Sequence, residues 1–250
     1  MRRLFAIGIG AGDSEQLTVE AVRALNGLDV VFVVDKGEEV AELAALREQI
    51  CDRYVEGEHR TVFIPDPKRD RTAAAYREAV EDWRRARAAA WGEAITAELE
   101  VGETGAFLVW GDPALYDSTL AVLERIAAAA EPALEYTSIP GISSVQSLAA
   151  RHKISLTRVG ASVLVTTGRR LAAEGLPGDA DVVVMLDAGC AFSQLVDDDL
   201  DIYWGAYLGT ADEILIAGPL AEVATRIESV RAEARERKGW IMDTYLLRRR

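Results

Sequence analysis

The first half of the chain alternates between short apolar runs and longer segments of mixed polarity. The runs are rich in Val, Ile, Leu and Phe, short enough for buried strands, and cover residues 4–10, 29–34, 60–65 and 104–110. In the segments between and after them, apolar residues recur at the three- and four-residue spacing of helices, over 14–27, 38–50, 71–99 and 115–130. Strands that alternate with helices predict a parallel sheet covered by helices.

Beyond residue 132 the strand-like runs become denser. One strand leads through a Pro-Gly turn into a helix over 133–150, and four more follow at 161–168, 181–189, 201–209 and 213–220. A helix over 220–238 and a last strand over 239–247 complete the pattern, before three arginines that we interpret as a solvated tail. We therefore expect two α/β domains, with a parallel sheet in an N-terminal domain (1–113) and a mixed sheet in a C-terminal domain (114–250).

Local signals refine two of these helices. Ser14 is a candidate N-cap for the first helix, and Asn26-Gly27 is a candidate stop. In the Ala-rich segment 71–99, Tyr76, Val80, Trp83 and Trp91 recur at helical spacings. Such a stripe is more typical of helix packing than of a ligand cage.

Composition excludes several functions. The chain has 250 residues, 50% of them hydrophobic, and a net charge of -13, which argues against a general binder of nucleic acid or of anionic membranes. An anionic small substrate stays possible, because it needs only a local basic pocket. We find no stretch long and apolar enough for a membrane span and no signal peptide, and we expect a soluble, cytoplasmic protein.

The few metal-ligating residues predict that there is no metal site. His59 and His152 are the only histidines, and Cys51 and Cys190 are far apart in the sequence. A multi-histidine site is therefore not available. Idle or buried thiols in a reducing compartment are the favoured interpretation of the cysteines.

The turn "GIGAGD" (residues 8–13) follows a strand and precedes a helix, as a dinucleotide-binding turn does. Its glycines would allow close backbone approach to a ligand. However, Asp13 and Ser14 occupy the region where the last glycine of G-x-G-x-x-G should fall, and a carboxylate there would repel a pyrophosphate. Nicotinamide binding is disfavoured, and it remains an alternative.

The stretch "WGDPALY" (residues 110–116) places Gly, Asp and Pro directly after a buried strand. Other predicted strands also end in Gly, Pro or small hydroxyl residues, at 10–12, 140–144 and 209–210. Each could be an ordinary tight turn. Since ligands of open α/β sheets bind at the carboxyl ends of strands, the set together predicts a backbone-lined cleft for a compact polar ligand.

The motifs "GIGAGD", "GDPALY", "PGISS" and a late "GT" make the chain similar to the tetrapyrrole methylases, the S-adenosylmethionine-dependent enzymes of sirohaem and cobalamin synthesis. The resemblance spans nearly the whole chain. It implies a methyl donor folded into a cleft between the two domains, and a homodimer. The chain departs from the family pattern at Ala11, where proline is common, at Trp110, where a small residue is frequent, and at Lys153–Leu156, where a Gly-Ile-Pro-Leu type segment is usual.

The resemblance also implies donor-binding residues, most of them acting through main-chain groups. The sulfonium and ammonium groups of the donor are cations, so Asp112 and strand-end carbonyls are reasonable neighbours. Leu115 and Leu186 could supply apolar walls for adenine. The implied S-adenosylmethionine-binding residues are Ala11, Gly111, Asp112, Leu115, Ser143, Ser144, Leu186 and Gly209.

The stretches "VWGDPALYDSTL" and "VFVVDKG" look most like a family member that methylates C1 of a ring-contracted precorrin and releases the acetyl group there as acetate. Loss of an acetyl group requires a base or an oxyanion stabiliser. By position, Asp35, Tyr116 and Asp117 are the candidate catalytic residues. The alternative that Asp35 caps a helix and Tyr116 only packs stays open.

An anionic tetrapyrrole requires local basic groups on this acidic protein. Arg151, Lys153 and Arg158 lie in predicted loops or element ends and are the candidate substrate-binding residues. Any one of them could equally be a solvated surface charge. Three other functions stay open: a methylase of protein or RNA on the same scaffold, with RNA disfavoured by the net charge; a non-catalytic domain that kept the donor-binding fold; and the nicotinamide oxidoreductase.

Overall fold

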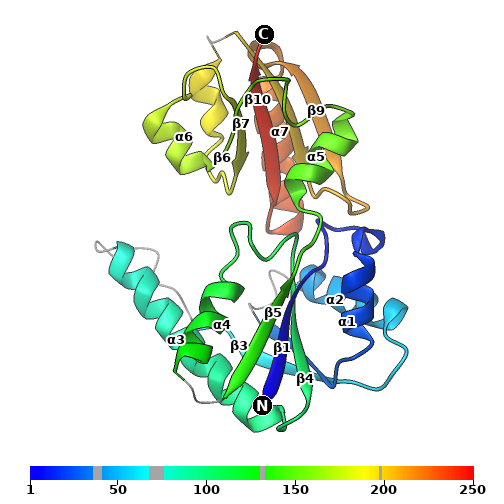
Figure 1. Ribbon diagram of the computed structural model, residues 1–250. Helices are drawn as coiled ribbons and strands as arrows, with labels where there is room; N and C mark the ends of the chain where they lie inside the picture. Colours follow the sequence, from blue (N-terminus) through cyan, green and yellow to red (C-terminus); the bar gives the residue numbers. More distant parts are fainter. Residues whose placement is uncertain (36–40, 68–75, 130–132, 197–198) are drawn as a thin grey trace. The chain divides into compact units, whose positions relative to one another are not determined.

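The computed structural model describes residues 1–35, 41–67, 76–129, 133–196 and 199–250 (Figure 1). The chain divides into two compact units. The first contains residues Met1–Gly10 and Ser14–Ile142, and the second contains Ala11–Asp13 and Ser143–Arg250. The predicted starts of the second and third helices, at residues 38 and 71, lie outside the described residues.

The first unit is built on a five-stranded, fully parallel sheet. Its strands are β1 (Arg2–Gly8), β2 (Val30–Asp35), β3 (Arg60–Pro65), β4 (Thr104–Val109) and β5 (Leu134–Ile139). They lie in the order β3-β2-β4-β1-β5. The prediction of an N-terminal parallel sheet is therefore confirmed.

Helices cover both faces of this sheet (Figure 1). The short helix η1 (Ser14–Gln16), α1 (Val19–Leu25) and α2 (Ala41–Tyr54) belong to one side, where Ile7, Ile9 and Leu25 are buried together. On the other side, α3 (Tyr76–Glu98) and α4 (Thr119–Ala128) pack on a cluster that includes Phe32 and Phe107. Parallel strands alternate their side chains between two covered faces, so they require apolar residues at nearly every position.

The buried tryptophan of α3 supports the interpretation of its aromatic stripe as packing. Trp91 is 1% exposed and stacks on Phe107, with ring centroids 4.2 Å apart. Phe107 stacks in turn on Phe32 at 5.3 Å.

The second unit is built on a five-stranded mixed sheet, also as predicted. Its strands are β6 (Val163–Thr167), β7 (Asp181–Met185), β8 (Leu200–Ala206), β9 (Ile214–Pro219) and β10 (Asp243–Arg249), in the order β6-β7-β10-β8-β9. Only β6 and β7 are parallel to each other. The helices are α5 (Ser144–His152), α6 (Gly168–Glu174), η3 (Ala191–Leu195) and the long α7 (Leu220–Lys238), whose Leu220 and Ile227 are buried in the core of the unit.

The predicted domain boundary between residues 113 and 114 falls inside the first unit. The chain passes to the second unit at Ile142 and Ser143 instead. The reason is that β5 pairs with β1 along six residues and completes the first sheet. β5 therefore belongs to the first unit, although it lies more than a hundred residues after its partner β1 in the sequence.

Helix boundaries differ from the prediction for local reasons. Thr18 and not Ser14 caps α1, because the Thr18 hydroxyl accepts a hydrogen bond from the amide of Ala21 (3.0 Å). The helix predicted from residue 115 begins at Thr119, since residues 112–118 form turns stabilised by aspartate side chains. The sequence pattern missed α6, a helix of seven residues that buries only Gly168 and Leu171.

The three C-terminal arginines are not a solvated tail. Arg248 and Arg249 belong to β10, and Arg248 Nε lies 2.8 Å from a carboxylate oxygen of the fully buried Asp181. The Arg250 amide donates to the carbonyl of Asp199. The last strand therefore extends to Arg249 and includes two of the three arginines.

Candidate functional site

In the first unit, the ends of β1, β4 and β5 approach one another backbone to backbone. A Cβ at Gly8 would lie 2.4 Å from the amide nitrogen of Gly141, and a Cβ at Gly141 would lie 2.1 Å from the carbonyl oxygen of Gly111. Gly111 and Gly10 also pair in an isolated bridge, in which the Gly111 amide donates to the Gly10 carbonyl at 2.8 Å. Only glycine fits between these strand ends. The glycines of the motifs are therefore needed for the close packing of the strand ends, in addition to any role in ligand binding.

Asp112 ties two of these strand ends together. Its Oδ2 accepts a hydrogen bond from the Gly141 amide (2.9 Å), and its Oδ1 accepts one from the Ala114 amide (2.8 Å). The turn after β4 is thereby fixed to the turn after β5. Because both carboxylate oxygens have backbone partners within the unit, Asp112 has a structural role that the sequence did not indicate.

The turn continues through the candidate catalytic residues Tyr116 and Asp117. Tyr116 is 45% exposed and has a φ of 54°, in the left-handed region that a bulky side chain rarely adopts. Asp117 is exposed, and its Oδ1 accepts a hydrogen bond from the Thr119 amide (2.6 Å) at the start of α4. Leu115, a candidate donor-binding residue, lies half-buried between Asp112 and this pair.

Asp35 is the last residue of β2, at the same carboxyl edge of the sheet. It is exposed, and its carbonyl accepts a hydrogen bond from the Asp66 amide after β3 (3.0 Å). The structure thus brings Asp35, Gly111, Asp112, Tyr116 and Asp117 to one edge of one sheet, where parallel α/β sheets bind their ligands. The alternative that Asp35 caps a helix involves residues 36–40, which are outside the described part of the chain.

One edge of the second sheet gathers most of the other candidates. Thr244 of β10 pairs with Met185 of β7 and with Gly205 of β8, so these three residues share this edge. The Ser144 and Thr244 hydroxyls are 3.0 Å apart and share a hydrogen bond. Leu186 directly follows Met185, and Gly209 lies three residues beyond the end of β8.

Ser143 caps α5 at this edge. Its hydroxyl accepts a hydrogen bond from the Val145 amide, and its own amide donates to the side chain of Gln146. This is a complete capping box. Ser143 is 3% exposed, so its side chain acts as a helix cap within the unit.

Leu186 is the most unusual residue of the edge. Its φ is 53°, and it is 65% exposed, although both properties are unfavourable for leucine. The next residue, Asp187, is buried and accepts hydrogen bonds from the amides of Gly189 and Ala191 and from the Tyr245 hydroxyl. Burial, followed by the charge of Asp187, raises the pKa of Tyr245 far above its ordinary range, so the phenol stays protonated. A buried network therefore holds an apolar side chain out of the core.

The residues 11–13 pack against the turn after β8. Ala11 is buried, and a Cβ at Gly12 would lie 2.5 Å from the Leu208 carbonyl oxygen. Gly209 has a φ of 80°, and a Cβ there would lie 2.8 Å from the Asp13 amide nitrogen. Ala11 and Gly209 are therefore brought together, as candidates for one site must be.

Arg151 belongs to the same surroundings. Its Nε donates to Glu213 Oε2 at 2.8 Å, and the same oxygen accepts a hydrogen bond from the Gly209 amide at 2.8 Å. Lys153 is exposed and ends α5 in the left-handed conformation, with a φ of 55°. Glycine would be unstrained at this position.

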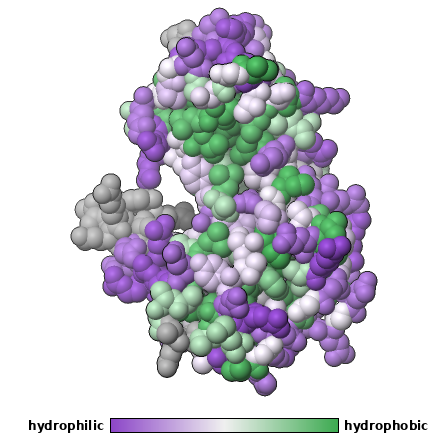
Figure 2. All heavy atoms as spheres, in the orientation of Figure 1, coloured by the Kyte–Doolittle hydropathy of each residue, from purple (hydrophilic) through white to green (hydrophobic). Residues whose placement is uncertain are grey.

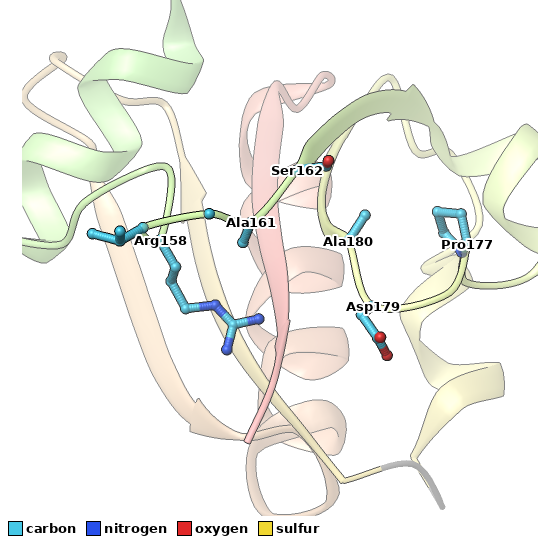
Figure 3. Close-up of a pocket in the computed structure, with 8 residues that line it drawn as sticks. Arg158, Ala161, Ser162, Pro177, Asp179 and Ala180 are labelled. Carbon is cyan, nitrogen blue, oxygen red and sulfur yellow. The ribbon is translucent and has the colours of Figure 1, made fainter.

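Arg158 lies at the opposite edge of the sheet. Its Nη2 donates to Asp181 at the start of β7 (2.8 Å), whereas Leu186 follows the end of that strand. A pocket of about 590 Å³ lies between the segments 158–162 and 177–180, which precede β6 and β7. Arg158 is among the residues that line it (Figure 3). The structure does not bring Arg158 together with the other candidates of the second unit, because the length of β7 separates them.

Apolar side chains are exposed elsewhere on this unit. Figure 2 shows a group of apolar side chains on the face of the second unit near β6 and β7. Leu164 of β6 is 42% exposed, less than Leu186. Leu186 is therefore more exposed than Leu164, and its exposure coincides with a left-handed backbone.

The cysteines show no sign of catalysis. Both are unpaired, and burial raises the pKa of the Cys51 thiol to about 11 and also raises that of Cys190. Within the described ranges, no three His, Cys, Asp or Glu residues are grouped as a metal site requires. Among the same residues, no helix has the length and apolar character needed to span a bilayer. The absence of a metal in the working protein stays a prediction.

Sequence reasoning missed the buried polar residues behind these edges. Asp187 fixes the turn that follows Leu186 by accepting hydrogen bonds from the amides of Gly189 and Ala191. Arg87 of α3 contacts the turn after β4 through Ser118. The spacing Trp83-Arg87-Trp91, four residues apart each time, was a usable signal, because it places an arginine between two indoles on one helix face. Asp187 carried no comparable signal.

The model of the family "Tetrapyrrole (Corrin/Porphyrin) Methylases" matches residues 3–224 of the chain. The chain belongs to the tetrapyrrole methylase family. The motifs that carried the resemblance therefore led to the correct family.

Two relatives resemble this tetrapyrrole methylase over its full length. A precorrin-6A synthase [deacetylating] from Sinorhizobium sp is 49% identical over 251 residues, which cover 100% of this chain and 96% of the relative. The crystal structure of a cobalamin-synthesis-related protein, CobF from Corynebacterium diphtheriae, has a TM-score of 0.86 at 34% identity and covers 99% of this chain and 98% of its own.

More distant structures support the fold. A uroporphyrin-III C-methyltransferase from Thermus thermophilus, solved in complex with S-adenosylhomocysteine, has a TM-score of 0.61 at 17% identity, with 98% of this chain and 92% of the other covered. At this identity the likeness concerns the fold of the methylase alone.

Proposed function

We propose that this tetrapyrrole methylase transfers a methyl group from S-adenosylmethionine to C1 of precorrin-5 and releases the acetyl group of that carbon as acetate, which gives precorrin-6A in cobalamin biosynthesis. The observation that carries the proposal is the 49% identity to the precorrin-6A synthase [deacetylating], which spans the whole chain. The stretch "VWGDPALYDSTL" had already indicated this member of the family.

The donor-binding residues are proposed from the strand ends. In the first unit they are Gly111, Asp112 and Leu115, and in the second they are Ala11, Ser143, Ser144, Leu186 and Gly209. The described geometry fits such a ligand in two respects. The turns place Gly111 and Gly209 in left-handed backbone conformations that other residues rarely adopt, and Leu186 presents an apolar surface, which an adenine ring could cover.

The donor supplies an activated methyl group, so methyl transfer asks little of the side chains. The new bond joins C1 to the methyl carbon, and the electron pair of the broken carbon–sulfur bond stays on sulfur. The protein has to align the two partners and exclude water. A site made largely of backbone and poor in histidine is sufficient for this step.

Release of acetate is the more demanding half. Water adds to the acetyl carbonyl, the bond between C1 and the carbonyl carbon breaks, and the electron pair left on C1 is the pair that forms the bond to the methyl carbon. Summed over both halves, one water and one donor are consumed, and one acetate, one S-adenosylhomocysteine and two protons are formed. A group that takes a proton from water or stabilises the oxyanion is needed. We propose Asp35, Tyr116 and Asp117 for these roles, because they share one edge of the first sheet.

Two of the three candidate substrate-binding residues remain in the proposal. Arg151 and Lys153 remain proposed contacts for the carboxylate arms of the tetrapyrrole, and Arg151 lies next to Gly209 through Glu213. Arg158 is not part of this set, since it lies beside Asp181 at the start of β7, at the other edge of the sheet. A homodimer in the cytoplasm, without nucleic-acid or membrane partners, also remains a proposal from the sequence.

A methylase of protein or RNA on the same scaffold is the second candidate. The net charge of -13 disfavours RNA. The test is incubation with S-adenosylmethionine that carries an isotopically labelled methyl group and a panel of precorrins. We expect the label in precorrin-5 product that has lost its acetyl group, as identified by mass spectrometry. Label in a different precorrin, or in none, would contradict the assignment.

A further inference from the structure

Arg87 is a buried cation in the first unit. It is 5% exposed, and its guanidinium carbon lies 4.7 Å from the ring centre of Trp83 and 5.0 Å from that of Trp91. Trp91 stacks on Phe107 of β4. Burial of a charged guanidinium costs free energy unless partners compensate for the lost hydration. The two indole rings compensate in part, and the polar contacts of Arg87 show what else the charge does.

The polar contacts of Arg87 join three separate segments. Nε forms an ion pair with Asp66 Oδ1, just beyond β3, at 2.8 Å. Nη1 donates a hydrogen bond to Ser118 Oγ, beyond β4, at 2.6 Å. Burial lowers the pKa of Arg87, but the charges of Asp66 and Asp117 oppose this, and a guanidinium stays charged in proteins.

The hydroxyl of Ser118 does not cap the helix that follows. Ser118 occupies the N-cap position of α4, yet it makes no side-chain capping bond. Asp117 does this instead, through its bond from the Thr119 amide. The Ser118 hydroxyl can therefore be removed without loss of a cap, and this isolates the contact with Arg87.

We propose that Arg87 is a positioning residue, which acts through Ser118 to hold Tyr116 and Asp117 in place for the release of acetate. The inference rests on the proposed function. A tyrosine with a φ of 54° persists only where its neighbours fix the backbone. The donor-binding part of the turn is held separately, because Asp112 is bound by the Gly141 amide. Loss of the contact with Arg87 should therefore affect catalysis and not donor binding.

The experiment compares Ser118→Ala with Ser118→Thr, which keeps a hydroxyl. The matched control is Arg85→Ala, on the same helix, where Arg85 is exposed and pairs with Asp82. We expect Ser118→Ala to lose about tenfold in kcat, with the dissociation constant of S-adenosylhomocysteine changed less than about twofold. Ser118→Thr should recover most of the rate, and the control should match the wild type.

Amide hydrogen exchange gives a readout that does not depend on activity. In Ser118→Ala, exchange should accelerate about tenfold at residues 116–119 and stay unchanged at Gly111, at Gly141 and at Leu115, whose amide donates to the Asp112 carbonyl. Unchanged exchange and kcat in Ser118→Ala would overturn the inference, as would equal losses of rate and donor affinity. A wild-type protein that methylates no precorrin would instead contradict the proposed function, while the exchange data would still decide whether Arg87 holds the turn.

Discussion

At the scale of single residues, Tyr116, Lys153 and Leu186 of the proposed site have left-handed backbones. Leu186 has a left-handed backbone and is 65% exposed, although the network around Asp187 could have accommodated a glycine there. A left-handed conformation costs a non-glycine residue about 1–2 kcal/mol. Strain of this kind persists only where the surrounding structure fixes the backbone, and it clusters at functional sites. We infer that the task of Leu186 is to contact the methyl donor.

Leu186→Gly should therefore separate stability from binding. Relief of the strain should raise the melting temperature by roughly 2–4 °C. The loss of an apolar contact should weaken S-adenosylhomocysteine binding by about tenfold or more. Differential scanning calorimetry measures the melting temperature, and isothermal titration calorimetry measures the affinity for S-adenosylhomocysteine. Leu164→Ala, at another exposed leucine of this unit, should leave the affinity unchanged, and unchanged affinity in Leu186→Gly would remove Leu186 from the site.

The hydrophobic pattern could indicate candidate site residues that follow directly on strands, such as Gly111 and Gly209, because a strand end is visible in it. Leu186 became a candidate only through the resemblance to the family. Arg158 also looked like a site residue, but its position depends on the direction of β7, which the pattern does not give. Arg87 was missed because a buried arginine in an Ala-rich helix looks like surface charge until its partners are known.

At the scale of elements, the alternation of apolar runs predicted the succession of strands along the chain and the type of both sheets, but not the order of the strands within either sheet. It failed at element ends, where single hydrogen bonds decide. The Asp112 and Asp117 carboxylates each accept a hydrogen bond from the amide two residues ahead. Because of these two turns, α4 begins only at Thr119. Competition between side chain and backbone at such positions has no hydrophobic signature.

The contact between the end of α7 and the turn after β8 provides a pH-dependent test. Lys238 Nζ lies 2.6 Å from Asp212 and also lies over the rings of Tyr207 and Trp240. The hydrogen bond from Lys238 lowers the pKa of Asp212 from its ordinary 3.8. A carboxyl with a lowered pKa stabilises the folded state above its unfolded pKa, and the effect is lost as the pH falls through the folded value.

Asp212→Asn should therefore melt at a lower temperature than the wild type at pH 7. The difference should shrink once the pH falls below about 4, because both proteins then lack the charge. Thermal unfolding followed by circular dichroism across this range measures it. Glu236→Gln, an exposed change on α7 for which the described residues show no ion pair, should not lower the melting temperature at pH 7. A constant difference between Asp212→Asn and wild type at all pH values would contradict the explanation.

At the scale of the whole molecule, the division of the chain depends on long-range pairing. Residues 114–142 looked like the beginning of a second domain, yet β5 completes the first sheet beside β1. Residues 11–13 show the opposite case, since they belong to the second unit although they lie near the N-terminus. Pairing between segments more than a hundred residues apart cannot be read from local periodicity, and for this reason the domain boundary was misplaced while both sheet types were correct.

In the proposed reaction, one protein both methylates and deacetylates the same carbon. The most direct measurement counts acetate and S-adenosylhomocysteine in a single reaction of the purified protein with precorrin-5 and S-adenosylmethionine. The balanced reaction predicts one acetate for each S-adenosylhomocysteine throughout the time course. Methylated product that retains its acetyl group, with S-adenosylhomocysteine formed and no acetate, would contradict the claim.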